Sequence, residues 1–201
     1  MALENPKPSS ELGSFSFGGR KLLAAIILLG FALRSVRLDF QPLWWDEGYS
    51  IFFATRPLAE LLQRTALDIH PPFYYIVLQF WIGLFGATDA AVRWLSVLIG
   101  TLSLPLVYLL AQKTLRDARP ALIATLLLAI SPLHIFYSQE VRMYGLVTAF
   151  ALASTYFFVR LIEKSEWSQR DLPLTALYAL STTAALYTQY FAAFLIAFQF
   201  I

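Results

Sequence analysis

Two adjacent carboxylates, Asp46 and Glu47, follow a tryptophan pair in the stretch WWDEGYS, in a chain that is otherwise strongly apolar. A carboxylate can act as a general base that takes the proton of an attacking hydroxyl or amine. A carboxylate in a helix cap, or in a loop beneath a belt of aromatic side chains, is also an ordinary structural feature. The pair alone therefore leaves catalysis and a structural role open.

Charged residues in two further segments favour chemistry. Arg34 and Arg37 lie three residues apart and would share one face at the end of the first apolar run. A second polar stretch, YSQEVRMY, brings Glu140 and Arg142. Guanidinium groups bind phosphate oxygens through paired hydrogen bonds and can neutralise a departing phosphate. We therefore expect two loops that carry acids, arginines and tyrosines to meet around a phosphate, with one carboxylate as the base.

The composition indicates where these loops lie. Of the 201 residues 58% are hydrophobic and 14% are charged, and the mean hydropathy is +0.62. Because a soluble domain carries about 25% charged residues, this composition predicts a polytopic membrane protein. The net charge of +2 gives no reason to expect a nucleic-acid partner. The chain contains no cysteine, which excludes disulfides, thiolate catalysis and cysteine-ligated metals.

Apolar stretches that can cross about 30 Å of hydrocarbon, at about 1.5 Å per helical residue, recur along the chain. We expect an all-α, polytopic transmembrane helical bundle that follows a flexible cytoplasmic tail over residues 1–19. Residues 191–201 could begin a further span after a turn at 187–190. The expected spans are 22–38, 92–112, 121–137, 143–162 and 174–190.

The loop at 39–91 is expected to hold two helices that lie in the membrane interface. The first covers 56–67, where Pro57 favours a helix start and Glu60 and Arg64 form a pair at i,i+4. The second covers 73–85, which at about 20 Å is too short to cross the hydrocarbon. Its weakly polar residues recur every fourth position, as expected of a helix that lies along an interface: Tyr75, Gln79 and Gly83.

Basic residues predict the orientation. If the N-terminus is cytoplasmic and 73–85 does not cross, the basic clusters at 113–119 and 160–170 fall on the cytoplasmic side, as the positive-inside rule requires. Asp46 then lies on the extracytoplasmic side. The protein itself is expected in the plasma or inner membrane. The basic residues on the extracytoplasmic side are all arginine: Arg34, Arg37, Arg56, Arg64, Arg93 and Arg142. This bias favours a phosphate on that side, although arginine also anchors helix ends.

Three stretches, WWDEGYS, DIHPPFYY and SPLHIFYSQEVRMYG, make the sequence similar to the dolichyl- and polyprenyl-phosphate-mannose-type glycosyltransferases of the GT-C superfamily. This group includes protein O-mannosyltransferases and the aminoarabinose transferases of lipid A. The likeness extends from about Leu22 to Tyr190. It implies a GT-C fold, an extracytoplasmic active site, two interfacial helices in the first outer loop and a lipid-monophosphate sugar donor.

The resemblance also implies roles for individual residues. It makes Asp46 the catalytic carboxylate, Glu47 its supporting neighbour and Glu140 the acid of the second loop. The donor phosphate would be bound by arginines near these acids: Arg142, Arg34 and Arg37. Further candidates for the substrate pocket are Tyr49, His70, Tyr74, Gln139 and Tyr144.

The function that this resemblance implies is that of an inverting hexosyltransferase. It would move a mannose-like hexose or similar sugar from polyprenyl phosphate to a hydroxyl or amine of a lipid, glycan or protein acceptor. No cofactor is assigned, and a divalent metal held by Glu47 with His70 or His134 is left open. The alternatives are a non-catalytic lipid-handling protein or transporter, and a truncated, inactive partner subunit. Because relatives of this kind continue through more helices, we expect residues 20–201 to be the N-terminal module of a longer enzyme.

Overall fold

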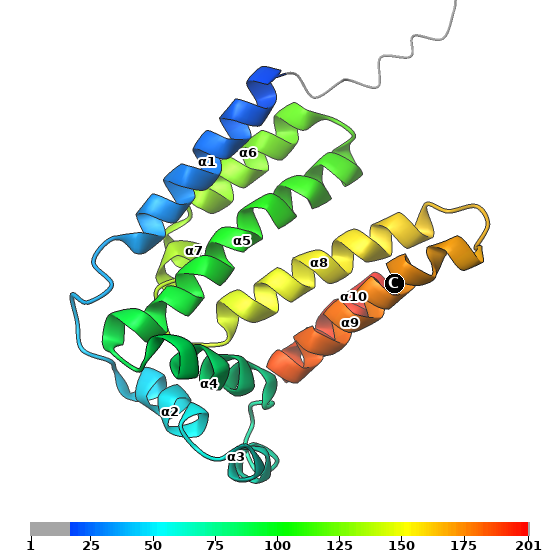
Figure 1. Ribbon diagram of the computed structural model, residues 1–201. Helices are drawn as coiled ribbons and strands as arrows, with labels where there is room; N and C mark the ends of the chain where they lie inside the picture. Colours follow the sequence, from blue (N-terminus) through cyan, green and yellow to red (C-terminus); the bar gives the residue numbers. More distant parts are fainter. Residues whose placement is uncertain (1–16, 201) are drawn as a thin grey trace, which may run out of the picture.

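The computed structural model describes residues 17–200, and this part of the chain is α-helical with no β-strand (Figure 1). The expected all-α class is therefore confirmed for these residues. Residues 1–16 of the expected tail lie outside the described part. The last three residues of that tail, 17–19, are helical, because the first helix already begins at Phe17.

Most of the described chain lies in helices joined by short turns. In chain order these are α1 (Phe17–Ser35), α2 (Trp45–Ala54), α3 (Leu58–Thr65), α4 (Phe73–Phe85), α5 (Asp89–Leu115), α6 (Ala118–Ala129), α7 (Pro132–Tyr137), α8 (Tyr144–Ile162), the 3-10 turn η1 (Gln169–Asp171), α9 (Leu172–Thr188), the 3-10 turn η2 (Tyr190–Ala192) and α10 (Ala193–Gln199).

The long helices run side by side, and the short helices α2, α3 and α4 gather at one end of them (Figure 1). Helix α5 is central and packs against α1, α6 and α8, while α9 packs on the far side of α8. Among the described residues, two helices are long and apolar enough to cross a membrane: α5, with 27 residues, and α8, with 19. At about 1.5 Å per residue, α5 is about 40 Å long.

The basic clusters share the end of the bundle that lies opposite α2, α3 and α4. The start of α1, the α5–α6 turn and the α8–α9 turn all lie at this end (Figure 1). The first carries Arg20 and Lys21, and the other two carry the clusters at 113–119 and 160–170. From the sequence, these basic clusters are expected on one side of the membrane, and in the structure they lie at one end of the bundle.

Local sequence signals explain where the helices begin and end. The expected span at 121–137 is divided, because the side-chain oxygen of Ser131 accepts a hydrogen bond from His134 N and Pro132 opens a new helix. The expected turn at 187–190 is present, since α9 ends at Thr188 and Gln189 is extended. The expected spans at 92–112 and 143–162 correspond to α5 and α8.

Helix α4 has the expected bounds, 73–85, but its polar stripe packs against α2. The Gln79 amide donates to the carbonyl oxygens of Ala54 and Arg56 at 3.1 and 2.5 Å. The ring of Tyr75 stacks on Phe53 with centroids 4.9 Å apart. The polar stripe of α4 therefore holds α2 against α4. From the sequence, this stripe was expected to face the membrane interface.

Two glycines allow α1, α5 and α7 to approach closely. A Cβ atom at Gly100 of α5 would lie 2.1 Å from the Ser138 hydroxyl oxygen and 2.6 Å from the Ser138 Cβ. A Cβ at Gly30 of α1 would lie 2.4 Å from a methyl carbon of Leu104. These contacts hold the end of α7, and with it the polar segment 138–143, against α5.

Candidate functional site

The two acids of WWDEGYS lie in the first turn of α2, and their side chains have different surroundings. Trp44 precedes the helix, and its backbone N–H donates to the Glu47 carboxylate at 3.2 Å. Successive side chains of a helix point about 100° apart. Accordingly, the Glu47 side chain is 1% exposed, whereas that of Asp46 is 40% exposed.

Glu47 is held in a buried ion pair with Arg93 of α5. Two guanidinium nitrogens, Nε and Nη2, donate to its two carboxylate oxygens at 2.9 and 2.7 Å. The backbone N–H of Val141 donates to the same carboxylate at 3.1 Å. Arg93 also donates to the carbonyl oxygens of Leu38 and Gln41 in the α1–α2 linker. One carboxylate thereby joins α2, α5, the linker and the segment 138–143.

Asp46 lies beside Arg142, which comes from the second polar segment. The Arg142 guanidinium donates to the Asp46 backbone carbonyl at 3.3 Å, and its Nη2 lies 3.9 Å from the Asp46 carboxylate. The Arg142 side chain is only 5% exposed, and its Nε has no hydrogen-bond partner among the described residues. The structure thus brings the predicted acid and the predicted arginine together from positions 96 residues apart in the sequence.

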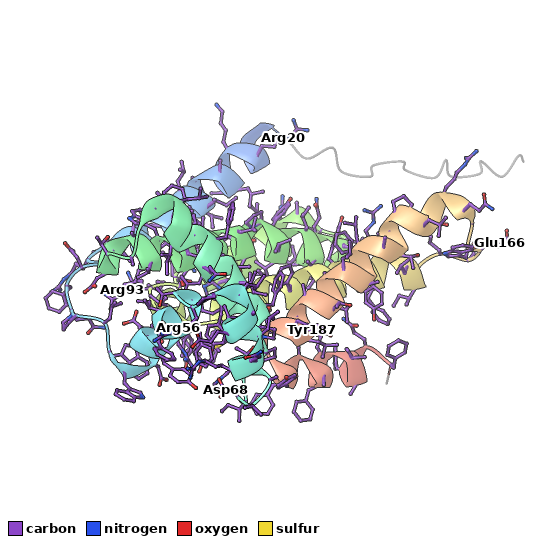
Figure 2. All side chains as sticks on the ribbon, turned by 60° about the horizontal axis from the view of Figure 1, so that its bottom comes forward. Arg20, Arg56, Asp68, Arg93, Glu166 and Tyr187 are labelled. Carbon is purple, nitrogen blue, oxygen red and sulfur yellow. The ribbon has the colours of Figure 1, made fainter. Side chains whose placement is uncertain are left out.

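Polar groups from α2, α4 and the segment before α4 surround this pair. The His70 Nδ1 lies 3.6 Å from the Asp68 carboxylate. The charge of Arg142 lowers the pKa of three side chains, and the charge of Asp68 raises the pKa of the same three: His70, Tyr49 and Tyr75. Figure 2 shows Asp68, Arg56 and Arg93 on the part of the molecule that lies away from Arg20 and Glu166.

Several buried polar atoms of this region have no hydrogen-bond partner within residues 17–200. They are Asp68 Oδ2, His70 Nδ1, Tyr74 Oη, Tyr75 Oη and Arg142 Nε. An unpaired buried polar group costs about 1–3 kcal/mol, so native cores rarely keep several of them together. These atoms lie around Asp46 and Arg142, and two of them, Asp68 Oδ2 and His70 Nδ1, face each other at 3.6 Å.

The environment shifts the pKa of several of these groups. Burial, followed by the nearby carboxylates of Glu47 and Asp46, raises the pKa of Glu140 to about 7, against the opposing charges of Arg142 and Arg93. Burial, followed by the charge of Arg142, lowers the pKa of His70. Near neutral pH the Glu140 carboxyl can therefore hold a proton, and the charged form of His70 is disfavoured.

Arg34 has a different environment from the other predicted phosphate ligands. Its side chain is fully buried, and it donates to the carbonyl oxygens of Gly30, Ala129 and Leu128 and to Nδ1 of His134. These bonds connect α1 to α6 and α7. Four of its donor interactions are thus made within the protein and join helices, while its Nε has no hydrogen-bond partner among the described residues. Its role toward a phosphate stays a prediction.

The other predicted residues lie at or near the two polar segments. Arg37 and Gln139 line a pocket together with Glu140, next to the α1–α2 linker. Tyr74, a candidate for the substrate pocket, is fully buried in the core with Phe53 and Tyr75. Tyr144 is the first residue of α8, and the centre of its ring lies 5.7 Å from the Arg142 guanidinium carbon.

Two of the residues that suggested a metal, Glu47 and His134, are engaged in other contacts. Glu47 is occupied by Arg93 and two backbone N–H groups, and His134 accepts from Arg34. Within residues 17–200, no group of three or more His, Cys, Asp or Glu side chains is arranged to hold a metal ion. The described residues therefore do not fit the metal site that the resemblance left open.

Two residues of the site were not predicted from the sequence as site residues. Asp68 stands in the stretch DIHPPFYY, but nothing in that stretch shows that its carboxylate faces Tyr49 and His70. Arg93 was assigned only to the arginine-rich side of the protein. A charged residue in an otherwise apolar span usually has a buried partner, and this signal could have identified Arg93.

Comparison with known protein families gives a match over residues 69–201, about two thirds of the chain, to the family described as dolichyl-phosphate-mannose-protein mannosyltransferase. The chain belongs to this mannosyltransferase family. No curated protein and no solved structure matches the chain. The matched range includes His70, Glu140 and Arg142, whereas Asp46 lies before it, so the role of Asp46 depends on the geometry described above.

Membership makes this mannosyltransferase-family protein a glycosyltransferase of the GT-C kind, and families of this kind are embedded in membranes. The two long apolar helices, α5 and α8, fit that setting. The match therefore favours the enzyme over the transporter and lipid-handling alternatives. It agrees with the resemblance based on WWDEGYS, DIHPPFYY and the segment around Glu140.

Proposed function

We propose that this protein transfers a mannose-like hexose from a polyprenyl-phosphate donor to a hydroxyl or amine acceptor on the extracytoplasmic face of the membrane, with Asp46 as the general base. The observation that carries the proposal is the pairing of a half-exposed carboxylate with the buried guanidinium of Arg142, amid buried polar atoms that lack partners. A base and a cation side by side suit a reaction in which a proton leaves the acceptor while a phosphate leaves the sugar.

The reaction balances as follows. The acceptor oxygen or nitrogen attacks C1 of the sugar from the face opposite the phosphate, and its proton passes to the Asp46 carboxylate. The bond between C1 and the phosphate oxygen breaks, and its electron pair leaves with polyprenyl phosphate. Attack from the opposite face inverts the configuration at C1. Because a phosphate leaving group needs no proton, one base and a cation are sufficient.

Arg142 would bind the donor phosphate. Its Nε is buried and unpartnered among the described residues, and Nη2 lies 3.9 Å from Asp46. A phosphate on this guanidinium would place C1 of the sugar near the Asp46 carboxylate. Glu140 would orient the acceptor, since a carboxyl whose pKa is raised to about 7 can donate a hydrogen bond when protonated and accept one when ionised.

Glu47 has a positioning role in this proposal. Its carboxylate is fully buried and accepts from Arg93, Trp44 and Val141. It therefore holds the first turn of α2 against the segment that carries Glu140 and Arg142. Its loss would disturb the separation between Asp46 and Arg142 without removing a reacting group.

The experiment is a transfer assay with membranes that contain the wild-type protein or the variant Asp46→Asn. Radiolabelled polyprenyl-phosphate hexose is added, and the label that moves to lipid, glycan or protein is measured. Loss of a positioned base lowers the rate by about 10² to 10⁴. Asp39→Asn, the same change at an exposed position seven residues earlier, is the matched control and should retain wild-type activity. Wild-type transfer by Asp46→Asn would reject the assignment, and an inactive wild type would favour the partner-subunit alternative.

A further inference from the structure

A polar pocket lies next to Arg93, the partner of Glu47 in the buried ion pair. It has a volume of about 430 Å³ and lies between the end of α1, the α1–α2 linker and α7. Its polar wall includes Arg37, Gln139 and Glu140, and its apolar wall includes Val36, Ile135 and Phe136. Such a division of polar and apolar walls suits an amphipathic molecule that has a polar headgroup.

The positive charge of Arg37 is available in this pocket. Within residues 17–200 it forms no ion pair, and its guanidinium carbon lies 3.5 Å from the centre of the Phe40 ring. Its backbone is in the left-handed region at φ 60°, which is unfavourable for a residue with a side chain. An arginine without a carboxylate partner, stacked on an aromatic ring, suits an anionic group of a ligand.

The pocket shares Glu140 with the surroundings of the proposed reaction centre, because the charges of Asp46 and Arg142 both act on the Glu140 carboxyl. Glu140 lines the pocket, and the next residue, Val141, donates its backbone N–H to Glu47. Arg93 also lines the pocket and makes the ion pair with Glu47, which is the neighbour of Asp46 in the first turn of α2. A headgroup in the pocket would therefore contact Glu140, whose carboxyl lies within the electrostatic range of Asp46.

We propose that this pocket binds the acceptor, and that the acceptor is an anionic lipid with free hydroxyl groups. Arg37, which the resemblance made a ligand of the donor phosphate, would instead bind the phosphate of the acceptor headgroup. Glu140 would orient a hydroxyl, and the apolar part would contact Val36, Ile135 and Phe136. The hydroxyl oxygen forms the new bond to C1, its proton passes to Asp46, and polyprenyl phosphate leaves with the electron pair of the broken bond. The inference rests on the proposed function and adds the class of acceptor.

The experiment uses the whole protein in nanodiscs of three compositions, with radiolabelled polyprenyl-phosphate hexose. Phosphatidylcholine alone has a phosphate but no hydroxyl or amine, whereas discs that also contain phosphatidylglycerol or phosphatidylinositol offer hydroxyl groups next to a phosphate. Release of polyprenyl phosphate reports donor turnover, and label in the phospholipid reports transfer. The expected result is labelled phosphatidylglycerol or phosphatidylinositol, with no labelled phosphatidylcholine.

Arg37→Gln tests the pocket itself. Its KM for the acceptor lipid should rise about tenfold or more, because a charge-assisted hydrogen bond is lost, while its KM for the donor stays within about twofold of the wild-type value. Arg37→Lys should recover part of the acceptor affinity. Arg116→Gln is a matched control, because Arg116 is also exposed and left-handed, with φ 56°, but lies at the α5–α6 turn. The KM values of Arg116→Gln for the acceptor lipid and for the donor should equal those of the wild type.

The outcomes separate this inference from the proposed function. Label that passes only to protein, or a rise of the donor KM in place of the acceptor KM in Arg37→Gln, would overturn the lipid acceptor and leave the role of Asp46 intact. Donor turnover that is absent in all three compositions would overturn both proposals together.

Discussion

Truncation of Glu47 to alanine should destabilise the protein strongly, because it leaves Arg93 as a buried charge without its partner. The Arg93 and Glu47 side chains are 4% and 1% exposed, and the carboxylate accepts hydrogen bonds from the guanidinium at 2.9 and 2.7 Å. Removing one member of a buried ion pair costs about 3–5 kcal/mol. For a chain of this length that loss lowers the melting temperature by roughly 6–20 °C.

The assay is thermal unfolding of the purified protein in detergent micelles, followed by tryptophan fluorescence. Glu60→Ala is the matched control, since it removes an exposed i,i+4 ion pair with Arg64 and should cost less than about 0.5 kcal/mol. The double variant Glu47→Leu, Arg93→Leu should recover much of the stability lost in Glu47→Ala, because no lone charge is then buried. If Glu47→Ala melts within the error of Glu60→Ala, the buried pair does not hold these segments together.

Two other perturbations follow from the same structure. Because burial raises the pKa of Glu140 to about 7, the folded protein binds this proton more tightly than the unfolded chain, so its free energy of unfolding should fall as the pH rises from 4.5 to about 7. This fall in the free energy of unfolding is on the order of 3 kcal/mol and should be absent in Glu140→Gln. Equal pH slopes of the unfolding free energy in the two proteins would contradict the prediction. Gly100→Ala should cost about 1–3 kcal/mol in the same melting assay, since its Cβ would lie 2.1 Å from the Ser138 hydroxyl oxygen. Gly48→Ala is the control, because a Cβ there has no neighbour within 4 Å among the described residues; similar losses in both variants would refute the packing argument.

Local patterns in the sequence predicted the local structure well. The bounds of α4 follow from the apolar run 73–85, and the Glu60–Arg64 pair follows from spacing on one helical face. The division between α6 and α7 was not predicted, although Ser131 and Pro132 together are a recognised helix start. Apolar length alone suggested one span there, and the start signal within it was not used.

The assignment of the arginines depended on contacts between distant segments, which spacing does not show. Arg34 was expected near a phosphate, but it binds backbone carbonyls of α1 and α6. Arg93 is paired with Glu47 across 46 residues, and Arg142 meets Asp46 across 96. A bias toward arginine on one side therefore reflects helix packing and ion pairing as well as phosphate binding.

The central claim is that Asp46 takes a proton while Arg142 holds the donor phosphate, and one comparison tests it most directly. The donor is bound to wild type, Asp46→Asn and Arg142→Gln in nanodiscs, its dissociation constant is measured, and transfer is then followed in a single turnover. Asp46→Asn should bind the donor at least as tightly as the wild type and transfer the sugar at least about 10²-fold more slowly, whereas Arg142→Gln should bind the donor about tenfold or more weakly. Equal donor affinity in Arg142→Gln, or wild-type single-turnover transfer in Asp46→Asn, would contradict the claim.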